Sequence, residues 1–259
     1  MKTIVLAGIL AWPVVAQTPT EPPPLIQLIR KARISAAPIR PYAEARAALN
    51  VIGMTSVTGL PETWLVEAHG SFATVEALDK AIGAVVTANP ANESPGAAMD
   101  DIVPPGRTLI GLYRPDWSYR SEQATRMLPA ARYFHVSIHR IRPGGESEFA
   151  ELVRLRRFGM DKANLDRPDL AYQVISGAAA GTYVFLAPLS SLRMLDDAIA
   201  KMPLYFEATT EGRGARKGGA EAEISREHLL FRVDPRISYV SDDFASADPA
   251  FWRGTPKEQ

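Results

Sequence analysis

The chain has 259 residues, 46% of them hydrophobic, with 29 basic and 29 acidic side chains and no cysteine. This charge balance gives no general attraction to nucleic acid or to anionic membranes, so we expect neither partner. The absence of cysteine excludes disulfides, thiol nucleophiles and every cysteine-ligated metal centre.

The N-terminal residues are typical of an export signal. A short basic start is followed by a mostly apolar run and by small residues ending at Ala16. We therefore expect residues 1–16 to be a signal peptide that is cleaved near Ala16, and residues 17–24 to be a proline-rich linker. The alternative is that the apolar run forms a buried first strand. We expect export to the periplasm or the exterior, without a membrane anchor, because no cysteine follows the apolar run to carry a lipid.

Hydrophobic periodicity then predicts two series of elements in chain order. In the first series we expect a strand, a helix, a hairpin, a helix and a strand, at residues 25–32, 41–51, 54–58 with 64–69, 74–87 and 108–113. In the second series the same order is expected at residues 133–141, 146–163, 171–176 with 182–186, 191–202 and 228–233. The glycine-rich basic segment 212–219 is expected to be a flexible surface loop.

Two pairs of segments resemble one another and indicate an internal duplication. Residues 70–82 match 187–199 at a displacement of 117, and residues 109–119 match 229–239 at a displacement of 120. We therefore expect repeat units at 25–120 and 131–241, followed by a C-terminal tail at 242–259.

Each repeat has the order β-α-β-β-α-β, which is that of a ferredoxin-like unit. The helices of such a unit cover one face of an antiparallel sheet and leave the other face open. Two sheets that meet on their open faces would bury both. The predicted fold class is therefore α+β, with two ferredoxin-like repeats fused as a pseudo-dimeric α+β barrel.

The strand that leads through Arg142-Pro143-Gly144 into a helix, the hairpin and the repeat resemble the dimeric α+β-barrel superfamily. That superfamily includes antibiotic-biosynthesis-monooxygenase-like, NIPSNAP-like and stress-responsive barrel domains. The resemblance covers residues 25–241 and implies the barrel fold. It also implies a choice among cofactor-free monooxygenases, haem-binding or haem-degrading proteins and proteins of unknown role. No catalytic pattern matches, so no residue role follows from it.

The strand at 133–141 suggests a binding site, because polar and apolar residues alternate along it. The apolar row, which we expect to face the helices, is Phe134, Val136 and Ile138. The polar row, which we expect to face the barrel interior and to bind a ligand there, is Tyr133, His135, Ser137 and His139. The alternative is that this polar face is simply solvated.

His135 is the best catalytic candidate, because it lies deepest in the strand. Gln173 is a further candidate ligand-binding residue. His69 is expected at the surface more readily than beside a pocket. The equivalent first strand, 25–29, has no histidine, so a site would be centred on the second repeat.

A metal site is not expected. His135 and His139 are four residues apart on one strand, which separates them by roughly 13 Å, too far to share one ion. No cofactor is predicted, and haem held by one axial histidine is kept as an alternative.

Three functions stay open at this point. The first is the binding of a small molecule in the barrel interior. The second is an enzyme of the α+β-barrel type, either a cofactor-independent oxygenase with His135 as base or a haem protein. The third is a structural module whose interior is filled by its own side chains. Because a fused pair closes its own barrel, we expect a monomer in preference to a homodimer.

Overall fold

A computed structural model describes residues 20–31, 50–88 and 106–254. The predicted signal peptide and nearly all of the helix predicted at 41–51 lie outside the described residues. Val51, the last residue of that range, forms a β-bridge with Tyr239.

Within the described residues, eight strands close into one barrel in the order β1-β3-β2-β8-β5-β7-β6-β4, and every neighbouring pair is antiparallel. Their bounds are β1 Leu25–Lys31, β2 Ile52–Ser56, β3 Thr63–His69, β4 Gly106–Tyr113, β5 Tyr133–Ile141, β6 Leu170–Ser176, β7 Thr182–Leu189 and β8 Glu223–Val233. The first four strands lie in the order β4-β1-β3-β2, and the last four in the order β8-β5-β7-β6. Both are the ferredoxin-like order, so the predicted fold class is confirmed.

The strand registers relate the two units residue by residue. Leu25 and Tyr133 are the first residues of the equivalent strands β1 and β5. Leu25 lies opposite Leu112 and His69, and Tyr133 lies opposite Arg232 and Leu189. Leu112 therefore corresponds to Arg232, at the predicted displacement of 120. His69 corresponds to Leu189, also at 120, so the displacement of 117 was wrong by three residues. Helical segments whose apolar residues recur every three or four positions match almost as well when they are shifted by three.

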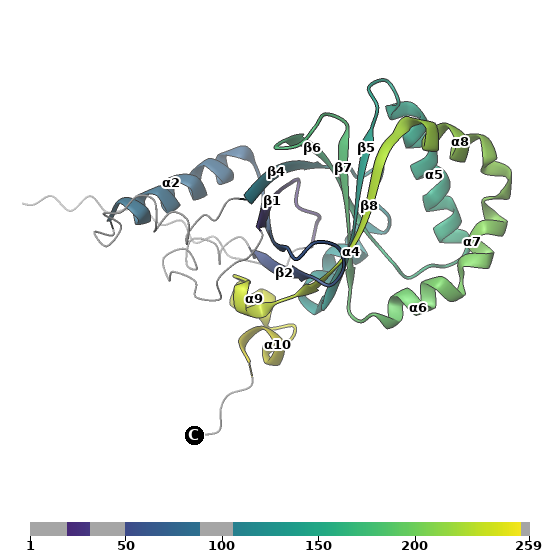
Figure 1. The fold of residues 1–259 in the computed structure, drawn as a ribbon. Helices are drawn as coiled ribbons and strands as arrows, with labels where there is room; N and C mark the ends of the chain where they lie inside the picture. Colours follow the sequence, from purple (N-terminus) through teal and green to yellow (C-terminus); the bar gives the residue numbers. More distant parts are fainter. Residues whose placement is uncertain (1–19, 32–49, 89–105, 255–259) are drawn as a thin grey trace, which may run out of the picture.

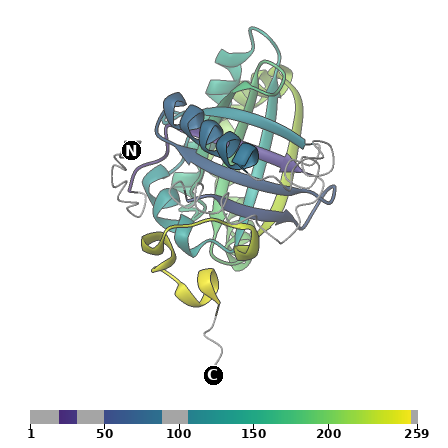
Figure 2. The same ribbon diagram turned by 90° about the vertical axis from the view of Figure 1, so that its left-hand side faces the viewer.

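The helices lie on opposite sides of the barrel (Figures 1 and 2). Helix α2 lies beside the first four strands, whereas α5 to α8 lie against the outer face of the second four (Figure 1). Their bounds, with those of the connecting and C-terminal helices, are α2 Phe72–Ala88, α4 Ser121–Met127, α5 Glu146–Lys162, α6 Arg193–Ala200, α7 Met202–Ala208, α8 Arg213–Ala222, α9 Asp242–Ala245 and α10 Pro249–Arg253. Among the described residues, no helix has both the length and the apolar character needed to cross a membrane.

The prediction of a flexible loop at 212–219 is wrong, because most of this segment belongs to helix α8, which packs on α5. A Cβ atom on Gly219 would lie 2.6 Å from Cβ of Leu152. A Cβ atom on Gly212 would lie 2.3 Å from a methyl carbon of Leu155. Gly212 and Gly219 therefore allow close packing against α5, and at Gly219, which lies within α8, this outweighs the low helix propensity of glycine.

The barrel interior is filled by apolar side chains, and this reverses the predicted orientation of β5. Phe134 and Val136 are 2% and 0% exposed and pack with interior residues of the first unit such as Trp64. The polar row of β5 therefore points outward, toward the helices, so its predicted placement in the interior is wrong. All eight strands contribute apolar side chains to one buried interior cluster, and the apolar row of β5 is the one that can be buried there at the lower cost.

The C-terminal residues close one end of this interior. Phe244 of α9 and Trp252 of α10 are 1% and 5% exposed and belong to the same apolar cluster. The indole Nε1 of Trp252 donates a hydrogen bond of 2.7 Å to the carbonyl oxygen of Pro129. Residues 242–253 are therefore packed against the barrel and contribute to its core.

Candidate functional site

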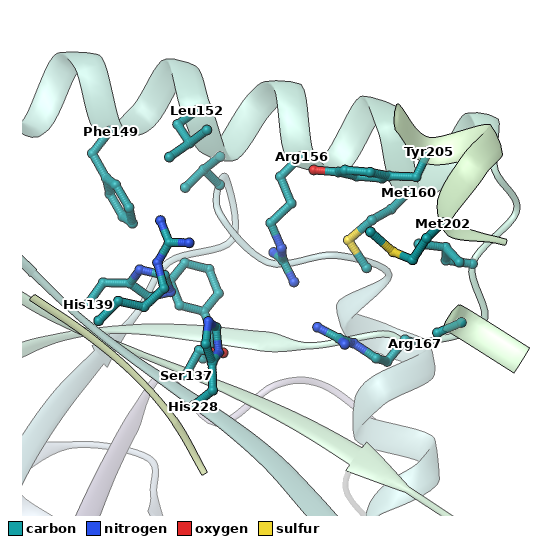
Figure 3. Close-up of a pocket in the computed structure, with 15 residues that line it drawn as sticks. Ser137, His139, Phe149, Leu152, Arg156, Met160, Arg167, Met202, Tyr205 and His228 are labelled. Atoms are coloured by element: carbon teal, nitrogen blue, oxygen red, sulfur yellow. The ribbon is translucent and has the colours of Figure 1, made fainter. Parts of the chain in front are cut away.

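A cavity of about 340 Å³ lies in the second unit, between the outer face of the sheet and the helices (Figure 3). Strands β5, β7 and β8 form its floor, and helices α5, α6 and α7 form its wall. The side chains around it fall into three groups: two arginines near its centre, a histidine–serine cluster at one end and an apolar group at the other (Figure 3).

The two central side chains, Arg156 of α5 and Arg167 of the α5–β6 connection, point into the cavity (Figure 3). Arg156 forms a salt bridge through Nη2 with the buried carboxylate of Asp169, whereas its Nη1 is buried without a hydrogen-bond partner. The Nε atom of Arg167 is also buried without a partner, and within the described residues Arg167 forms no salt bridge. Burial, and then the charge of Arg156, lower the pKa of Arg167. Unpaired buried cations are costly, so this arrangement suits an anion.

The polar end is built from two strands that run side by side. On β5, Ser137 lies directly opposite His228 of β8, and Oγ of Ser137 is 2.9 Å from Nδ1 of His228. Nδ1 of His139 is 2.5 Å from Oε1 of Glu223, which also accepts a hydrogen bond of 3.0 Å from Arg226. Burial raises the pKa of Glu223, but the hydrogen bonds from His139 and Arg226 outweigh it and lower the pKa to about 2. Glu223 is therefore ionised at neutral pH.

The histidines of this region are neutral at physiological pH. Burial, followed by the charges of Arg167, His228 and Arg156, lowers the pKa of His135 to about 4. Burial is also the main cause that lowers the pKa of His139 and of His228. Neutral imidazoles can each donate one hydrogen bond and accept another.

The far end of the cavity is apolar and could hold the hydrocarbon part of a ligand. Met160, Met202 and Tyr205 line it (Figure 3), together with Leu165 and Ala198. Methionine side chains are flexible and polarisable, so they adapt to ligands of different shapes.

The predicted site residues are only partly brought together. Ser137 and His139 line the cavity. His135 is not among its lining residues but stacks on His228, with ring centroids 5.5 Å apart.

Tyr133 and Gln173 lie away from the cavity, and Gln173 accepts a hydrogen bond of 3.0 Å from Arg114. Whether these five residues bind a ligand stays a prediction.

Sequence reasoning missed the two arginines. Arg156 carried a signal, because it follows Phe149 and Val153 and precedes Met160 at helical spacings of four, three and four. A charged residue on the apolar face of an amphipathic helix indicates a buried partner or a site. Arg167 carried no such signal, since it follows the helix in a loop.

His69 of the first unit is buried, contrary to the expected surface position. It is 1% exposed, its Nδ1 lies 3.3 Å from Oγ1 of Thr74, and its Nε2 lies 3.6 Å from a carboxylate oxygen of Glu67. It takes no part in the cavity.

Among the described residues, no three histidine, aspartate or glutamate side chains come close enough together to hold a metal ion.

Comparison with known proteins gives no matching family model and no matching curated protein. Solved structures with a similar chain trace include two candidate monooxygenases. That of Fusobacterium nucleatum is 10% identical, with 82% of this chain and 93% of that chain covered and a TM-score of 0.48. The candidate monooxygenase of Lactobacillus acidophilus is 11% identical, with 83% of this chain and 96% of that chain covered and a TM-score of 0.48.

The chlorite dismutase of Candidatus Nitrospira defluvii is 8% identical, with 86% of this chain and 94% of that chain covered and a TM-score of 0.46. Likenesses at this level carry no residue role over to this chain. The fold follows from the strand order alone, in which two ferredoxin-like units join edge to edge through β2–β8 and β4–β6. The chain therefore has the dimeric α+β-barrel fold, with both halves in a single polypeptide.

Proposed function

We propose that the protein binds a small molecule with one anionic group and an apolar body in the cavity between the sheet and helices α5 to α7. The observation that carries this proposal is that Arg156 and Arg167 line an otherwise largely apolar cavity and that each has a buried N–H group without a hydrogen-bond partner. A carboxylate is the simplest group that would satisfy both, because it accepts hydrogen bonds through two oxygens.

The charges around the cavity support a single anionic group. Arg156 is balanced by Asp169 and Arg226 by Glu223, which leaves the charge of Arg167 without a counter-ion among the described residues. The volume of about 340 Å³ falls within the range of small-molecule sites.

The barrel interior is a poor alternative location. The cavity found there has a volume of only about 90 Å³ and is lined mainly by apolar side chains, among them Phe134, Leu186 and Phe244. It is capped by residues near the N-terminus, where the hydroxyl of Tyr172 donates a hydrogen bond of 3.3 Å to the carbonyl oxygen of Pro23. We therefore place the ligand outside the barrel.

The enzyme alternatives are less well supported by this geometry. His135, the predicted base, has its pKa lowered to about 4 and is a weak proton acceptor. An axial histidine for haem would be His139 or His228, and the arginines would suit the haem propionates. However, the ring centroid of His139 lies 5.2 Å from those of Phe149 and Phe185 and 6.3 Å from that of His228. These neighbouring rings leave little room for a haem macrocycle bound to His139.

The proposal is tested by isothermal titration calorimetry of the purified protein with phenylpropanoate and decanoate, and with the uncharged amide of each acid. We expect at least one acid to bind and its amide to bind about tenfold more weakly or not at all, because only the acid pairs with the guanidinium groups. Equal binding of acid and amide, or binding of neither, would contradict the proposal.

Arg167→Met is the informative variant, because it removes the charge and keeps most of the volume. Arg156→Met would be harder to interpret, since it also strands the buried carboxylate of Asp169. Arg126→Met is the matched control, because Arg126 lies on the exposed face of α4 and forms a salt bridge with Glu122 outside the cavity. We expect the first variant to weaken acid binding about tenfold or more and the control to leave it unchanged.

A haem titration followed by absorbance, and oxygen uptake with phenolic acids, test the two enzyme alternatives on the same samples.

Export and the monomeric state are further parts of the proposal. Native mass spectrometry of the protein produced with its own N-terminus tests both. The expected product is a monomer that begins at Gln17. A protein that retains residues 1–16, or a dimer, would contradict the corresponding part.

A further inference from the structure

The polar end of the cavity offers hydrogen-bond acceptors on His139 and Ser137. Glu223 is ionised and therefore accepts the hydrogen bond that joins it to Nδ1 of His139, so the proton of this imidazole lies on Nδ1. Nε2 of His139 is then left with a lone pair. An acceptor in a ligand cavity calls for a ligand group that donates.

Ser137 and His228 add acceptor capacity at the same end. Their mutual hydrogen bond uses either the hydroxyl proton or one lone pair of Ser137, so at least one lone pair of its oxygen stays available in both tautomers of His228. The rings of His139 and His228 have centroids 6.3 Å apart, and both line the cavity next to Ser137. A ligand hydroxyl at this end of the cavity therefore has two acceptors to which it can donate its proton, on His139 and on Ser137.

The charges nearby select the kind of donor. Arg156, Arg167 and Arg226 all line this cavity, so a cationic ammonium donor would be repelled. A hydroxyl donates without carrying charge. It would also keep its proton, because burial lowers the pKa of His139 and of His228 and makes both of them weak bases.

We propose that the molecule held in this cavity is a hydroxy acid, whose anionic group binds Arg156 and Arg167 and whose hydroxyl donates its one proton to Nε2 of His139 or Oγ of Ser137. This inference rests on the proposed function and adds the second polar group that defines the class of ligand. In Figure 3 the arginines lie between the histidine end and the methionine end. The hydroxyl would thus lie on one side of the anionic group, and part of the apolar body on the other.

The test compares phenylpropanoate with its ortho-, meta- and para-hydroxy derivatives by isothermal titration calorimetry. We expect at least one hydroxy derivative to bind about tenfold more tightly than the parent acid, because the parent leaves a buried acceptor unsatisfied. His139→Leu and Ser137→Ala test the two acceptors, and at least one of them should reduce this preference, measured in each variant as the ratio of the affinities for the hydroxy derivative and the parent acid. Glu223 keeps its salt bridge with Arg226 in the first variant, and the second removes a single oxygen atom.

The possible outcomes separate the two proposals. If the parent acid binds through Arg167 and no hydroxy derivative binds more tightly, the hydroxy-acid inference fails while the proposed function stands. A preference for a hydroxy derivative that survives in both variants would also overturn the inference, because other groups would then hold the hydroxyl. If no acid binds at all, the proposed function fails and the inference fails with it.

Discussion

His135 of β5 and His228 of β8 stack on one another, with ring centroids 5.5 Å apart and ring planes inclined by 26°. Protonating both would place two like charges together beside Arg167 and Arg156, which face the same region. The folded state therefore favours neutral imidazoles, and this preference has consequences that can be measured.

We predict that the protein loses stability as the pH falls from about 6.5 toward 4. The folded-state pKa of His135 is about 4 and its usual value is 6.5. The unfolded chain therefore binds more protons in this interval, and the free energy of unfolding decreases with acidification. Thermal unfolding followed by circular dichroism at pH 7.5, 6.5, 5.5 and 4.5 should show a falling midpoint. His135→Leu should flatten the fall, and an unchanged slope in that variant would contradict the prediction.

Arg167→Met should raise the pKa of His135. Burial is the first cause of its low value, and the charge of Arg167 is the second, so removing that charge favours protonation. The pKa can be followed by NMR titration of the imidazole protons. Arg126→Met, on the exposed surface of α4, should leave the titration unchanged. Equal titration curves for wild type and Arg167→Met would show that Arg167 does not act on this imidazole.

Gly219→Ala should destabilise the protein, whereas Gly218→Ala on the same helix should not. A Cβ at 219 would lie 2.6 Å from Leu152, but a Cβ at 218 would lie 3.6 Å from Glu148, an ordinary contact distance. We expect Gly219→Ala to lower the free energy of unfolding by about 1–3 kcal/mol through overpacking. Gly218→Ala should raise it by about 0.5–1 kcal/mol through helix propensity. Urea unfolding of the two variants measures both, and equal effects would contradict the close packing of α8 on α5.

Trp252→Ala should cost about 3–5 kcal/mol of unfolding free energy. Trp252 is 5% exposed, and its ring centroid lies 5.4 Å from that of Phe244. Its indole Nε1 donates a hydrogen bond to the carbonyl oxygen of Pro129. Ala250→Ser, at an exposed position of the same helix, should change the stability by less than about 0.5 kcal/mol. A small effect of Trp252→Ala in urea unfolding would mean that α10 does not contribute to the core.

The sequence was sufficient for the order of the eight strands and for their division into two ferredoxin-like units. Strand alternation and helical periodicity are local properties, so they can be read without knowing what lies opposite each segment. The strand Tyr133–Ile141 was predicted with its observed bounds. The order β-α-β-β-α-β then leaves few ways to bury the open faces of two sheets, and the closed barrel is the one observed.

The sequence could not decide which row of β5 faces the barrel interior. A period of two separates Phe134 and Val136 from Ser137 and His139, but either row could in principle face the helices. The tertiary structure decides, because the closed interior receives apolar side chains from each of the eight strands, and a polar row would be costly to bury among them. On the helix side, Glu223 and His228 of β8 supply hydrogen-bond partners for His139 and Ser137 of the second row.

The candidate site depended still more on tertiary structure. Arg156 and Arg167 flank the end of α5, whereas Glu223 and His228 come from the last strand, more than 50 residues later in the sequence. The fold of the second unit pairs β5 with β8 and places α5 above them, and only this arrangement brings the four side chains to one region. Their chemistry is encoded in the sequence residue by residue, but the unpaired charge of Arg167 exists only in three dimensions, because it depends on which counter-ions the fold leaves out of reach.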